Sequence, residues 1–489
     1  MQRYLLKHIS ITLIITVVML CFAKGVMTAS AEVLDEQHFT PPAIRQFNLA
    51  DGVKVFFKED PELPTFSLSL YLPRGSLSRT LSNAAVYSAL SYLWRHGGAG
   101  ALSADELDTR LEHLSASIGV NVNDEYIQIS CGGLISEREE ILQLTKDVLF
   151  APRFDEERLL LWKMHMLDGI KKRSDTTDTI AGLSFVQLLY RGTILGQPLR
   201  DLDVKQVTAS AVEELYMKLF SLESAVVGVS GALTKEQVRQ DVVALLKQEV
   251  GISLAPHEHV KLDFKPMPGV FFVEKTFPQA TVYIGQRGPK RFVDDYAAIE
   301  VFNGIFGSDG AFSSMLTKEL RTQRGLTYSV AGGIYRDEPI GRNFIGFQTK
   351  SASVGDGITA AMSTLRAMKS GAFTEQQLAD VKTAARNSFI FRYDSIPEIV
   401  QRRALMEILH YPSSYEETFL AKIDAVTKQD VVAVANRYWK EEELMVLVVG
   451  DRSAYQSLGK VRNQLFARDP NLKKLSLKTL QFSTELLIK

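Results

Sequence analysis

Cysteine is scarce in this chain of 489 residues, since only Cys21 and Cys131 occur. Without Cys21, which lies in a segment that we expect to be removed, no intrachain disulfide can form, so the fold must be held by its core alone. Lysine and arginine form no long run, and the net charge is −1. The sequence therefore lacks a basic face of the kind that holds nucleic acid, and we expect no nucleic-acid partner.

The sequence also lacks an apolar run long enough for a membrane span. Its longest N-terminal run, Ile9–Ala23, is about 15 residues long, whereas a spanning helix needs about 20. Arg3 and Lys7 precede the run, and Ala29-Ser30-Ala31 follows it, which is typical of a secretory signal peptide. We predict that residues 1–31 are a signal peptide, that the mature chain is periplasmic, and that it contacts no membrane. An uncleaved anchor is the alternative.

Two parts of the sequence repeat each other. "FDEERLLLWKMHMLDGIKKR" is similar to "FTEQQLADVKTAARNSFIFR". Three pairs of positions share one spacing of 219 residues: Phe154 and Phe373, Thr208 and Thr427, and Gly231 and Gly450. A constant spacing across separate anchors indicates an internal repeat. We predict an N-terminal domain over residues 32–250, a linker rich in Pro and Gly over 251–269, and a C-terminal domain over 270–489.

Each copy mixes helical and strand patterns. Asp51-Gly52 between two alternating runs predicts a hairpin. Residues 82–97 have the apolar spacing of a helix, and Ser103 with Glu106 forms a capping box that starts the next one. "VNVNDEYIQIS" (120–130) predicts a half-buried strand. We therefore predict an α+β fold of two homologous domains, each a largely antiparallel sheet covered by helices.

This organisation resembles the insulinase/pitrilysin family of zinc metallopeptidases, which includes mitochondrial processing peptidase. The resemblance covers the chain from about residue 44 to residue 451. Family members that bind zinc carry an H-x-x-E-H motif on the helix that corresponds to residues 82–97. Two histidines on one helical face bind the metal there, and the glutamate between them activates the zinc-bound water. A second glutamate farther along the chain completes their zinc site.

The zinc motif is missing from this chain. Ser88, Ser91 and Tyr92 stand where the family has His, Glu and His, and Gly169 stands where it has the second glutamate. Zinc needs at least three suitable ligands, which this helix does not carry. We therefore expect no catalytic residue, no metal ligand and no cofactor in this chain, with zinc in a partner subunit.

A second family motif is present, in the C-terminal copy. "RTQRGLTY" has the family form R-x-x-x-G-L-x-Y, with Arg321 and Tyr328 at its two ends. In relatives these two side chains hydrogen-bond the backbone of an extended peptide and orient it across the zinc site. A guanidinium and a phenol suit this role because they donate to carbonyl oxygens whatever the peptide sequence. The resemblance thus implies that Arg321, at an apparent helix end, and Tyr328, in an apparent strand, bind substrate.

The absence of the zinc motif and the presence of the R-x-x-x-G-L-x-Y motif together imply half of an active site. We expect a non-catalytic, substrate-binding subunit of a heterodimeric zinc metallopeptidase. Its partner would be a homologous subunit that carries H-x-x-E-H, and the pair would enclose an extended peptide substrate. One alternative is a structural or peptide-binding scaffold with no role in proteolysis. A third reading, an active enzyme with an unrecognised site, also stays open.

The purified chain is expected to hold no stoichiometric zinc, because the helix over 82–97 offers no set of three ligands. Metal analysis by mass spectrometry after dialysis measures this directly. A stoichiometric zinc ion that resists dialysis would contradict the prediction.

Overall fold

The structure is a computed structural model that describes residues 41–49, 52–80, 82–247, 268–307, 313–465 and 478–480. Residues from Pro42 onward belong to one compact unit. The predicted signal peptide and residues 251–267 of the predicted linker lie outside the described residues. Below, the first half means residues 42–247 and the second half means residues 268–480.

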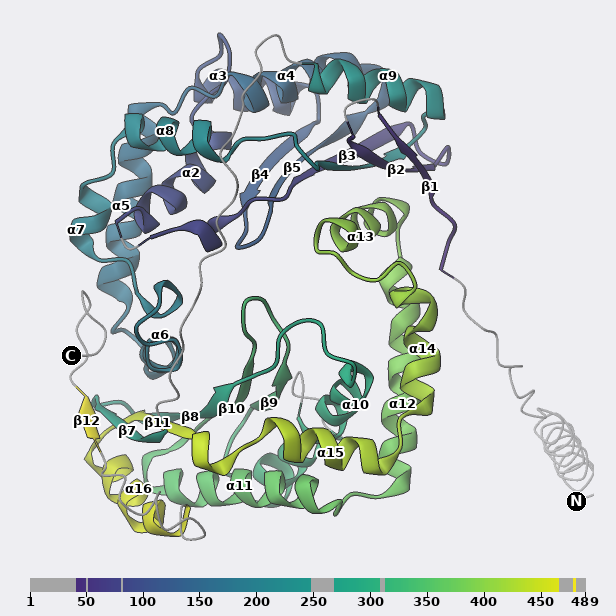
Figure 1. Ribbon diagram of the computed structural model, residues 1–489. Coiled ribbons are helices and arrows are strands. Elements are labelled where there is room, and N and C mark those ends of the chain that lie inside the picture. The colour runs from purple at the N-terminus through teal and green to yellow at the C-terminus, as the bar shows by residue number, and fades with distance from the viewer. Residues whose placement is uncertain are drawn as a thin grey trace, which may run out of the picture. The chain divides into compact units, whose positions relative to one another are not determined.

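Two six-stranded sheets form the framework, one in each half (Figure 1). The first has the order β1 (Arg45–Asn48), β2 (Lys54–Glu59), β6 (Val226–Gly231), β3 (Thr65–Leu72), β5 (Ile127–Leu134), β4 (Ser117–Val122). The second has the order β12 (Lys478–Leu480), β7 (Gly269–Glu274), β11 (Met445–Gly450), β8 (Gln279–Arg287), β10 (Arg342–Lys350), β9 (Val330–Tyr335). The pairs β2–β6, β7–β11 and β12–β7 are parallel, and the other pairs are antiparallel.

Helices cover both sheets, as the predicted α+β class requires. The first half contributes α2 (Ala84–His96), α3 (Ala104–His113), α4 (Arg138–Phe150), α5 (Glu156–Lys172), α6 (Thr177–Leu189), α7 (Asp201–Lys205), α8 (Ala209–Leu219) and α9 (Lys235–Leu246). The second half contributes α10 (Tyr296–Phe306), α11 (Val354–Ser370), α12 (Glu375–Phe389), α13 (Ile396–Ile408), α14 (Tyr415–Ala425), α15 (Lys428–Tyr438) and α16 (Arg452–Leu465). The predicted fold class is confirmed.

Several local predictions are also confirmed. β1 and β2 form the predicted hairpin, and Gly52 in its turn has φ +82°, a conformation that glycine adopts without strain. The helix predicted over residues 82–97 is α2. Ser103 and Glu106 form a capping box at the start of α3. These features depend on neighbours in the sequence, which explains why local pattern was enough to find them.

The prediction of one strand over residues 120–130 is wrong, because two strands and a turn occupy this stretch. β4 ends at Val122, the chain reverses, and β5 begins at Ile127 as its antiparallel partner. The Asn123 N–H donates to the Tyr126 carbonyl, 2.9 Å away, and closes the turn. A change of parity marks this reversal in the sequence, because the apolar positions are even up to Val122 and odd from Ile127 onward. A single strand would keep them on one parity.

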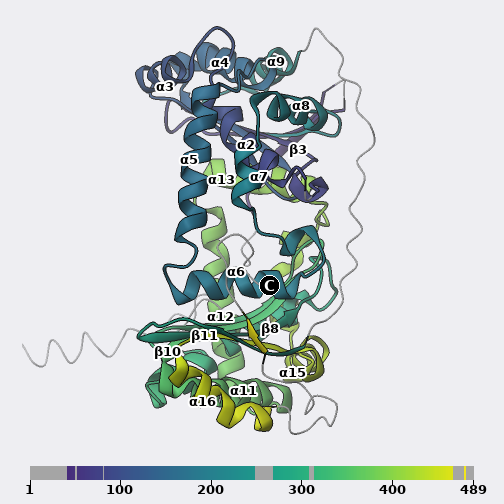
Figure 2. The same ribbon diagram turned by 90° about the vertical axis from the view of Figure 1, so that its left-hand side faces the viewer.

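A helix of the first half completes the second sheet. α6 packs on β8 and β11, so that Ile180, Phe185 and Leu188 lie in one buried cluster with Phe271 and Leu447 (Figure 2). The Thr281 hydroxyl donates to the Thr177 hydroxyl at 2.9 Å beside this cluster. Burial of this apolar area stabilises both halves together, since neither the helix nor the sheet has another partner for these faces in the described chain.

A helix of the second half completes the first sheet in return. α13 packs on β6, β2 and β3, where Val400, Ala404 and Ile408 cover Phe56 and Tyr71 (Figure 1). The residue ranges of α6 and α13 differ by 219, the spacing of the predicted repeat. The two halves thus exchange helices at corresponding positions of the chain.

Polar contacts reinforce this exchange. Arg291 of the second half forms a bidentate ion pair with Glu125 in the turn between β4 and β5. Lys54 of β2 forms an ion pair with Glu407 of α13. A bidentate pair fixes direction as well as distance, so the Arg291 contact sets how the hairpin of the first half meets the second half.

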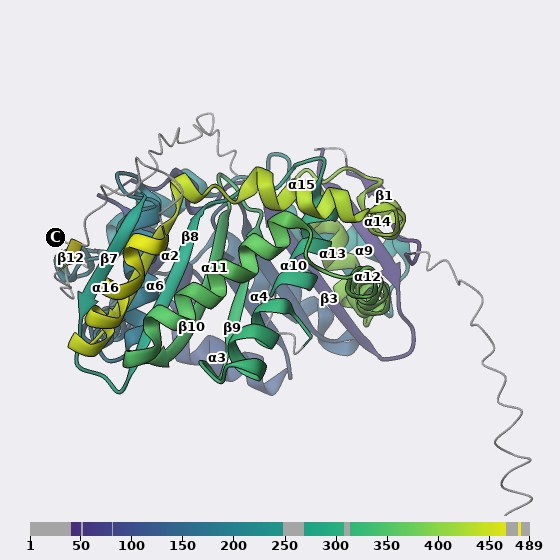
Figure 3. The same ribbon diagram turned by 90° about the horizontal axis from the view of Figure 1, so that it is seen from below.

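The opposite face of the second sheet is covered by helices of its own half. α11 and α16 cross this face, and α10 lies against β9 (Figure 3). The face on the α6 side therefore carries the accessible side chains of β10 and β9. Among the helices that the structure describes, none is both long and apolar enough to cross a membrane.

Replacing Phe185 by alanine tests the exchange of helices. Phe185 is 2% exposed, and removing a buried phenyl ring costs about 3–5 kcal/mol of unfolding free energy. The matched control is Phe391→Ala, because Phe391 is 73% exposed and surface changes stay within about 0.5 kcal/mol. Urea unfolding followed by tryptophan fluorescence measures both. Equal stability of the two variants would contradict the packing of α6.

Candidate functional site

Arg321 lies in a π-helix, Thr317–Gln323, rather than at the end of an α-helix. π-helical turns are rare in proteins, and many of those that occur lie at functional sites. Gly325 then adopts φ +59°, and the Leu326 N–H donates to the Leu320 carbonyl at 2.8 Å, which ends the helix. Tyr328 follows in the loop before β9, so the prediction that it lies in a strand is wrong. The strand begins at Val330, because the glycine-dependent turn delays the start of extended structure.

Side-chain hydrogen bonds hold the loop that carries Tyr328. The Thr327 hydroxyl donates to the Ser329 carbonyl at 2.7 Å and accepts from the Ser329 N–H at 3.2 Å. The Thr349 hydroxyl of β10 donates to the Leu326 carbonyl at 2.6 Å. These bonds fix the backbone on both sides of Tyr328, while its side chain is 83% exposed. Such an exposed aromatic ring on a fixed loop is well placed for binding.

The structure brings Arg321 and Tyr328 together. The guanidinium carbon lies 4.7 Å from the centroid of the phenol ring, within the range of a cation–π contact. Arg324 has a different role, because its Nε donates to Glu319 at 2.7 Å. Arg321 thus stacks on the exposed ring, and Arg324 bonds Glu319 of the π-helix.

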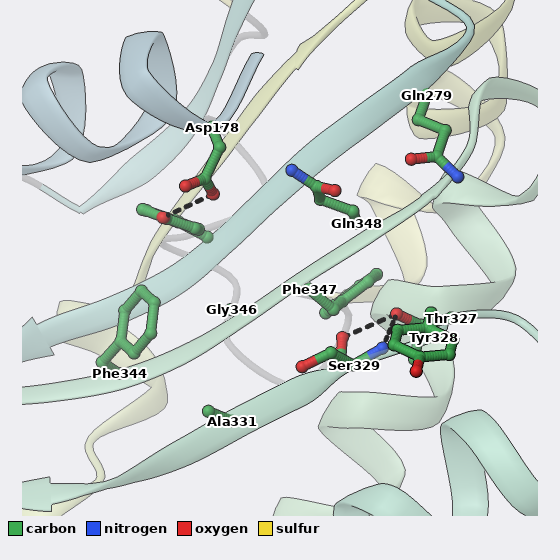
Figure 4. Close-up of a pocket in the computed structure, with 11 residues that line it drawn as sticks. Asp178, Gln279, Thr327, Tyr328, Ser329, Ala331, Phe344, Gly346, Phe347 and Gln348 are labelled. Carbon is green, nitrogen blue, oxygen red and sulfur yellow. Dashed lines mark hydrogen bonds between the residues drawn. The ribbon is translucent and has the colours of Figure 1, made fainter. Parts of the chain in front are cut away.

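A trough extends from Tyr328 across the accessible face of the second sheet (Figure 4). Its volume is about 370 Å³. Gly346 and Ala331 lie along its floor, and Phe344 and Gln348 lie on either side of Gly346 along β10. It is lined by Asp178, Gln279, Tyr283, Thr327, Tyr328, Ser329, Ala331, Phe344, Gly346, Phe347 and Gln348.

The far end of the trough combines both halves of the chain. The Tyr283 hydroxyl donates to Asp178 Oδ1 at 3.0 Å, across the contact between β8 and α6. Burial, followed by the nearby Asp178 carboxylate, raises the pKa of Tyr283 well above its usual value. Tyr283 therefore stays protonated and keeps its hydrogen to donate. Sequence reasoning missed this end, although Gly346 in the middle of a strand is a signal of close approach.

The helix that matches the zinc helix of the family has another use here. On α2, Ser91 accepts a hydrogen bond of 3.4 Å from the Val122 N–H of β4, and Arg95 donates to the Ile118 carbonyl at 2.8 Å. Tyr92 stacks on His96 with ring centroids 4.8 Å apart. Ser91 and Arg95 thus bond the edge of β4, and Tyr92 and His96 stack on each other. Together they do not form a set of zinc ligands.

The fourth position of the zinc comparison is equally unsuited. Gly169 is exposed on α5 and brings no ligand atom. Within the described residues, no group of three or more His, Cys, Asp or Glu side chains could hold a metal ion. The described residues at these positions therefore do not fit zinc.

The second half shows the same helix-to-edge contact. The Asn303 side chain of α10 donates to the Ile334 carbonyl at 2.9 Å and accepts from the Ile334 N–H at 2.7 Å. Asn303 and Ile334 lie 212 positions after Ser91 and Val122. Asn303 occupies both backbone groups that a strand added at Ile334 would use. Helix side chains thus fill part of the outer edges of β4 and β9.

Comparison with known proteins finds similar chains. Residues 206–385 match the family described as "Peptidase M16 inactive domain". The chain is 28% identical over 239 residues to "Probable inactive metalloprotease YmfF" of Bacillus subtilis, a match that spans 48% of this chain and only 54% of that protein. It is 22% identical over 407 residues to "Non-peptidase homolog YmxG" of Helicobacter pylori, covering 82% of this chain and 92% of that protein.

Solved structures have the same fold. A peptidase M16 inactive domain from Pseudomonas fluorescens has a TM-score of 0.74 at 22% identity and covers 84% of this chain and 98% of its own. The periplasmic protease PqqL from Escherichia coli has a TM-score of 0.72 at 14% identity, covering 86% of this chain and 47% of its own. The resemblance to zinc metallopeptidases that the sequence indicates is confirmed, since residues 206–385 match an M16 inactive-domain model and two similar proteins are named as an inactive metalloprotease and a non-peptidase homologue.

Replacing Asn303 by alanine tests the edge contact at β9. Asn303 is 8% exposed, and its loss leaves both backbone groups of Ile334 without these bonds, at a cost of about 1–3 kcal/mol. Amide hydrogen exchange at Ile334 is expected to accelerate. The control is Asn436→Ala, which removes two similar bonds at an exposed site. Unchanged exchange at Ile334 in the Asn303 variant would show that this contact does not protect the edge.

Proposed function

We propose that this chain is the non-catalytic, substrate-binding subunit of a heterodimeric zinc metallopeptidase that acts on peptides. The observation that carries the proposal is the stacked Arg321–Tyr328 pair, exposed on a fixed loop beside a trough. The chain itself has no ligand set on α2 to support hydrolysis. A homologous partner with H-x-x-E-H supplies the zinc and the activated water.

Arg321 and Tyr328 hold the peptide by its backbone. A guanidinium donates within its own plane, so stacking on a ring face does not consume its N–H groups. The phenol hydroxyl adds a further donor, and both donors suit carbonyl oxygens of an extended chain. Because the loop is already fixed by Thr327 and Thr349, little ordering cost remains to be met on binding. The pair therefore positions a peptide and does no chemistry itself.

The second candidate is a scaffold without a role in proteolysis. The contacts of Ser91 with Val122 and of Asn303 with Ile334 favour it, because they occupy edge positions at which a peptide would join a sheet. The trough and the stacked pair favour a chain that binds peptide over a purely structural one, and the resemblance to zinc metallopeptidases favours the subunit over a peptide-binding scaffold.

We place this function in the periplasm. The support is the signal-peptide pattern of residues 1–31, together with the fold shared with a protein named as a periplasmic protease. After export, the chain would bind its zinc-bearing partner subunit in the periplasm.

Mixing the purified chain with a homologue that carries H-x-x-E-H is expected to produce peptidase activity that neither protein has alone. In the mixture, Arg321→Ala and Tyr328→Phe should each lower kcat/KM by about tenfold or more, because each removes donors to the bound peptide. Tyr328→Phe keeps the ring and tests the hydroxyl alone. Cleavage of fluorogenic peptides measures the effect.

The control for these substitutions is Arg324→Ala, which removes an arginine that is paired within its own turn. It is expected to leave activity close to that of the unmodified chain. If the mixture cleaves equally well with all three variants, the pair does not bind substrate. If the mixture shows no activity with any available homologue, the scaffold is the better account.

A further inference from the structure

A short turn leads from α12 into α13, the helix that covers the first sheet (Figure 1). In this single 3-10 turn, residues 390–393, two adjacent apolar side chains face solvent. Ile390 is 51% exposed and Phe391 is 73% exposed. Scattered apolar side chains are ordinary on a protein surface. An exposed aromatic ring beside another apolar side chain and an arginine has instead the composition of a protein interface.

Arg392 follows this apolar pair and lies against two rings. Its guanidinium carbon is 5.2 Å from the ring centroid of Phe389 and 4.6 Å from that of Phe419. Within the residues that the structure describes, Arg392 forms neither a hydrogen bond nor an ion pair. Stacking on rings leaves the N–H donors of a guanidinium available. Arg392 is thus a cation held in place with no acceptor from its own described chain.

The neighbouring arginines have counter-charges. Arg402 forms an ion pair with Glu416, and Arg336 forms one with Glu300 at 2.9 Å. Burial, followed by the positive charge of Arg402, lowers the pKa of Arg392 from its usual value. Among these arginines, only Arg392 lacks a carboxylate partner in the described chain. A carboxylate brought to this place would therefore be bound favourably.

The first half of the chain provides an internal comparison. At the repeat spacing of 219, residues 171–173 correspond to residues 390–392. The two residues before Arg173 are exposed lysines, which suit a turn that contacts only water. Arg173 donates to the Leu199 carbonyl at 2.7 Å. The same turn thus has two forms: the first-half form satisfies its arginine within the chain, and the second-half form exposes apolar side chains and leaves its arginine without an acceptor.

We propose that the surface formed by Ile390, Phe391 and Arg392, here called the turn surface, docks the zinc-bearing partner subunit. The proposal rests on the function proposed above and names where the partner binds. A partner that holds this chain while peptides enter and leave the trough needs a contact outside the trough, and none of the three residues lines it.

The chemistry of the turn surface defines what the partner contributes. A carboxylate of the partner accepts from the Arg392 guanidinium in a charge-assisted pair, and apolar side chains beside that carboxylate cover Ile390 and Phe391. A basic or purely apolar surface would bury the guanidinium without a counter-charge, at a cost in desolvation. Charge complementarity therefore favours a partner surface with a carboxylate set among apolar groups.

Removing the guanidinium tests the charged part of the contact. Biolayer interferometry measures the Kd between the full purified chain and a homologue that carries H-x-x-E-H. Arg392→Met keeps an unbranched apolar side chain against Phe389 and Phe419 and removes every donor. Its Kd is expected to rise about tenfold or more, the effect of losing one charge-assisted pair. Added salt should weaken the complex of the unmodified chain more than that of the variant.

Converting the turn to its first-half form tests the apolar part. Ile390→Lys combined with Phe391→Lys introduces the residue type that the first half has at these positions, so the fold is kept and the apolar contact is lost. The Kd is expected to rise about a hundredfold, since buried apolar and aromatic anchors carry much of the energy of an interface. The matched control is Lys171→Ala combined with Lys172→Ala, which changes the corresponding turn and should leave the Kd unchanged. Thermal melting confirms that each variant is folded.

The outcomes separate this proposal from the function on which it rests. If Arg392→Met and the double lysine variant bind the partner as tightly as the unmodified chain, and the mixture still cleaves peptides, the turn surface is wrong and the proposed function stands. If the variants lose only the association of this chain with a second copy of itself, the surface belongs to a homodimer and the proposal is overturned. If the unmodified chain forms no complex with any such homologue, the proposed function fails together with the turn surface.

Discussion

The exchange of α6 and α13 between the two sheets is the contact on which the rest of this structure depends. Each sheet buries one face against helices of its own half, and part of the other face against a helix of the other half. An exposed apolar sheet face is costly, so neither half is complete without the helix it receives. The Arg291–Glu125 pair adds direction to a contact that apolar burial makes favourable.

The same exchange builds the candidate site. α6 covers β8 and β11 and brings Asp178 to the end of the trough, while the π-helix and its loop bring Arg321 and Tyr328 to the other end. One half of the chain thus contributes the acidic group, and the other half contributes the donors and the aromatic floor. On α2, meanwhile, Ser91, at the position of the family's glutamate, and Arg95 hold the edge of β4.

The sequence was sufficient for the fold class and for features set by near neighbours, such as the Gly52 turn and the capping box of α3. The spacing that the family shares also pointed to Arg321 and Tyr328, whose side chains stack in the structure, and their role in binding stays a prediction. The sequence failed at residues 120–130, where the turn was missed although the change of parity marked it. It also failed for Asp178 and Phe344, because Asp178 reaches the trough only where α6 packs on the second sheet and bonds Tyr283, and no local pattern encodes that contact.

The proposed function requires that a peptide lies in the trough with its backbone held by Arg321 and Tyr328. A crystal structure of the chain with a bound extended peptide would show whether it does. We expect peptide carbonyl oxygens within hydrogen-bond distance of the Arg321 guanidinium and the Tyr328 hydroxyl, with the peptide passing over Gly346. A peptide paired instead with the edge of β4, or bound away from the second sheet, would contradict it.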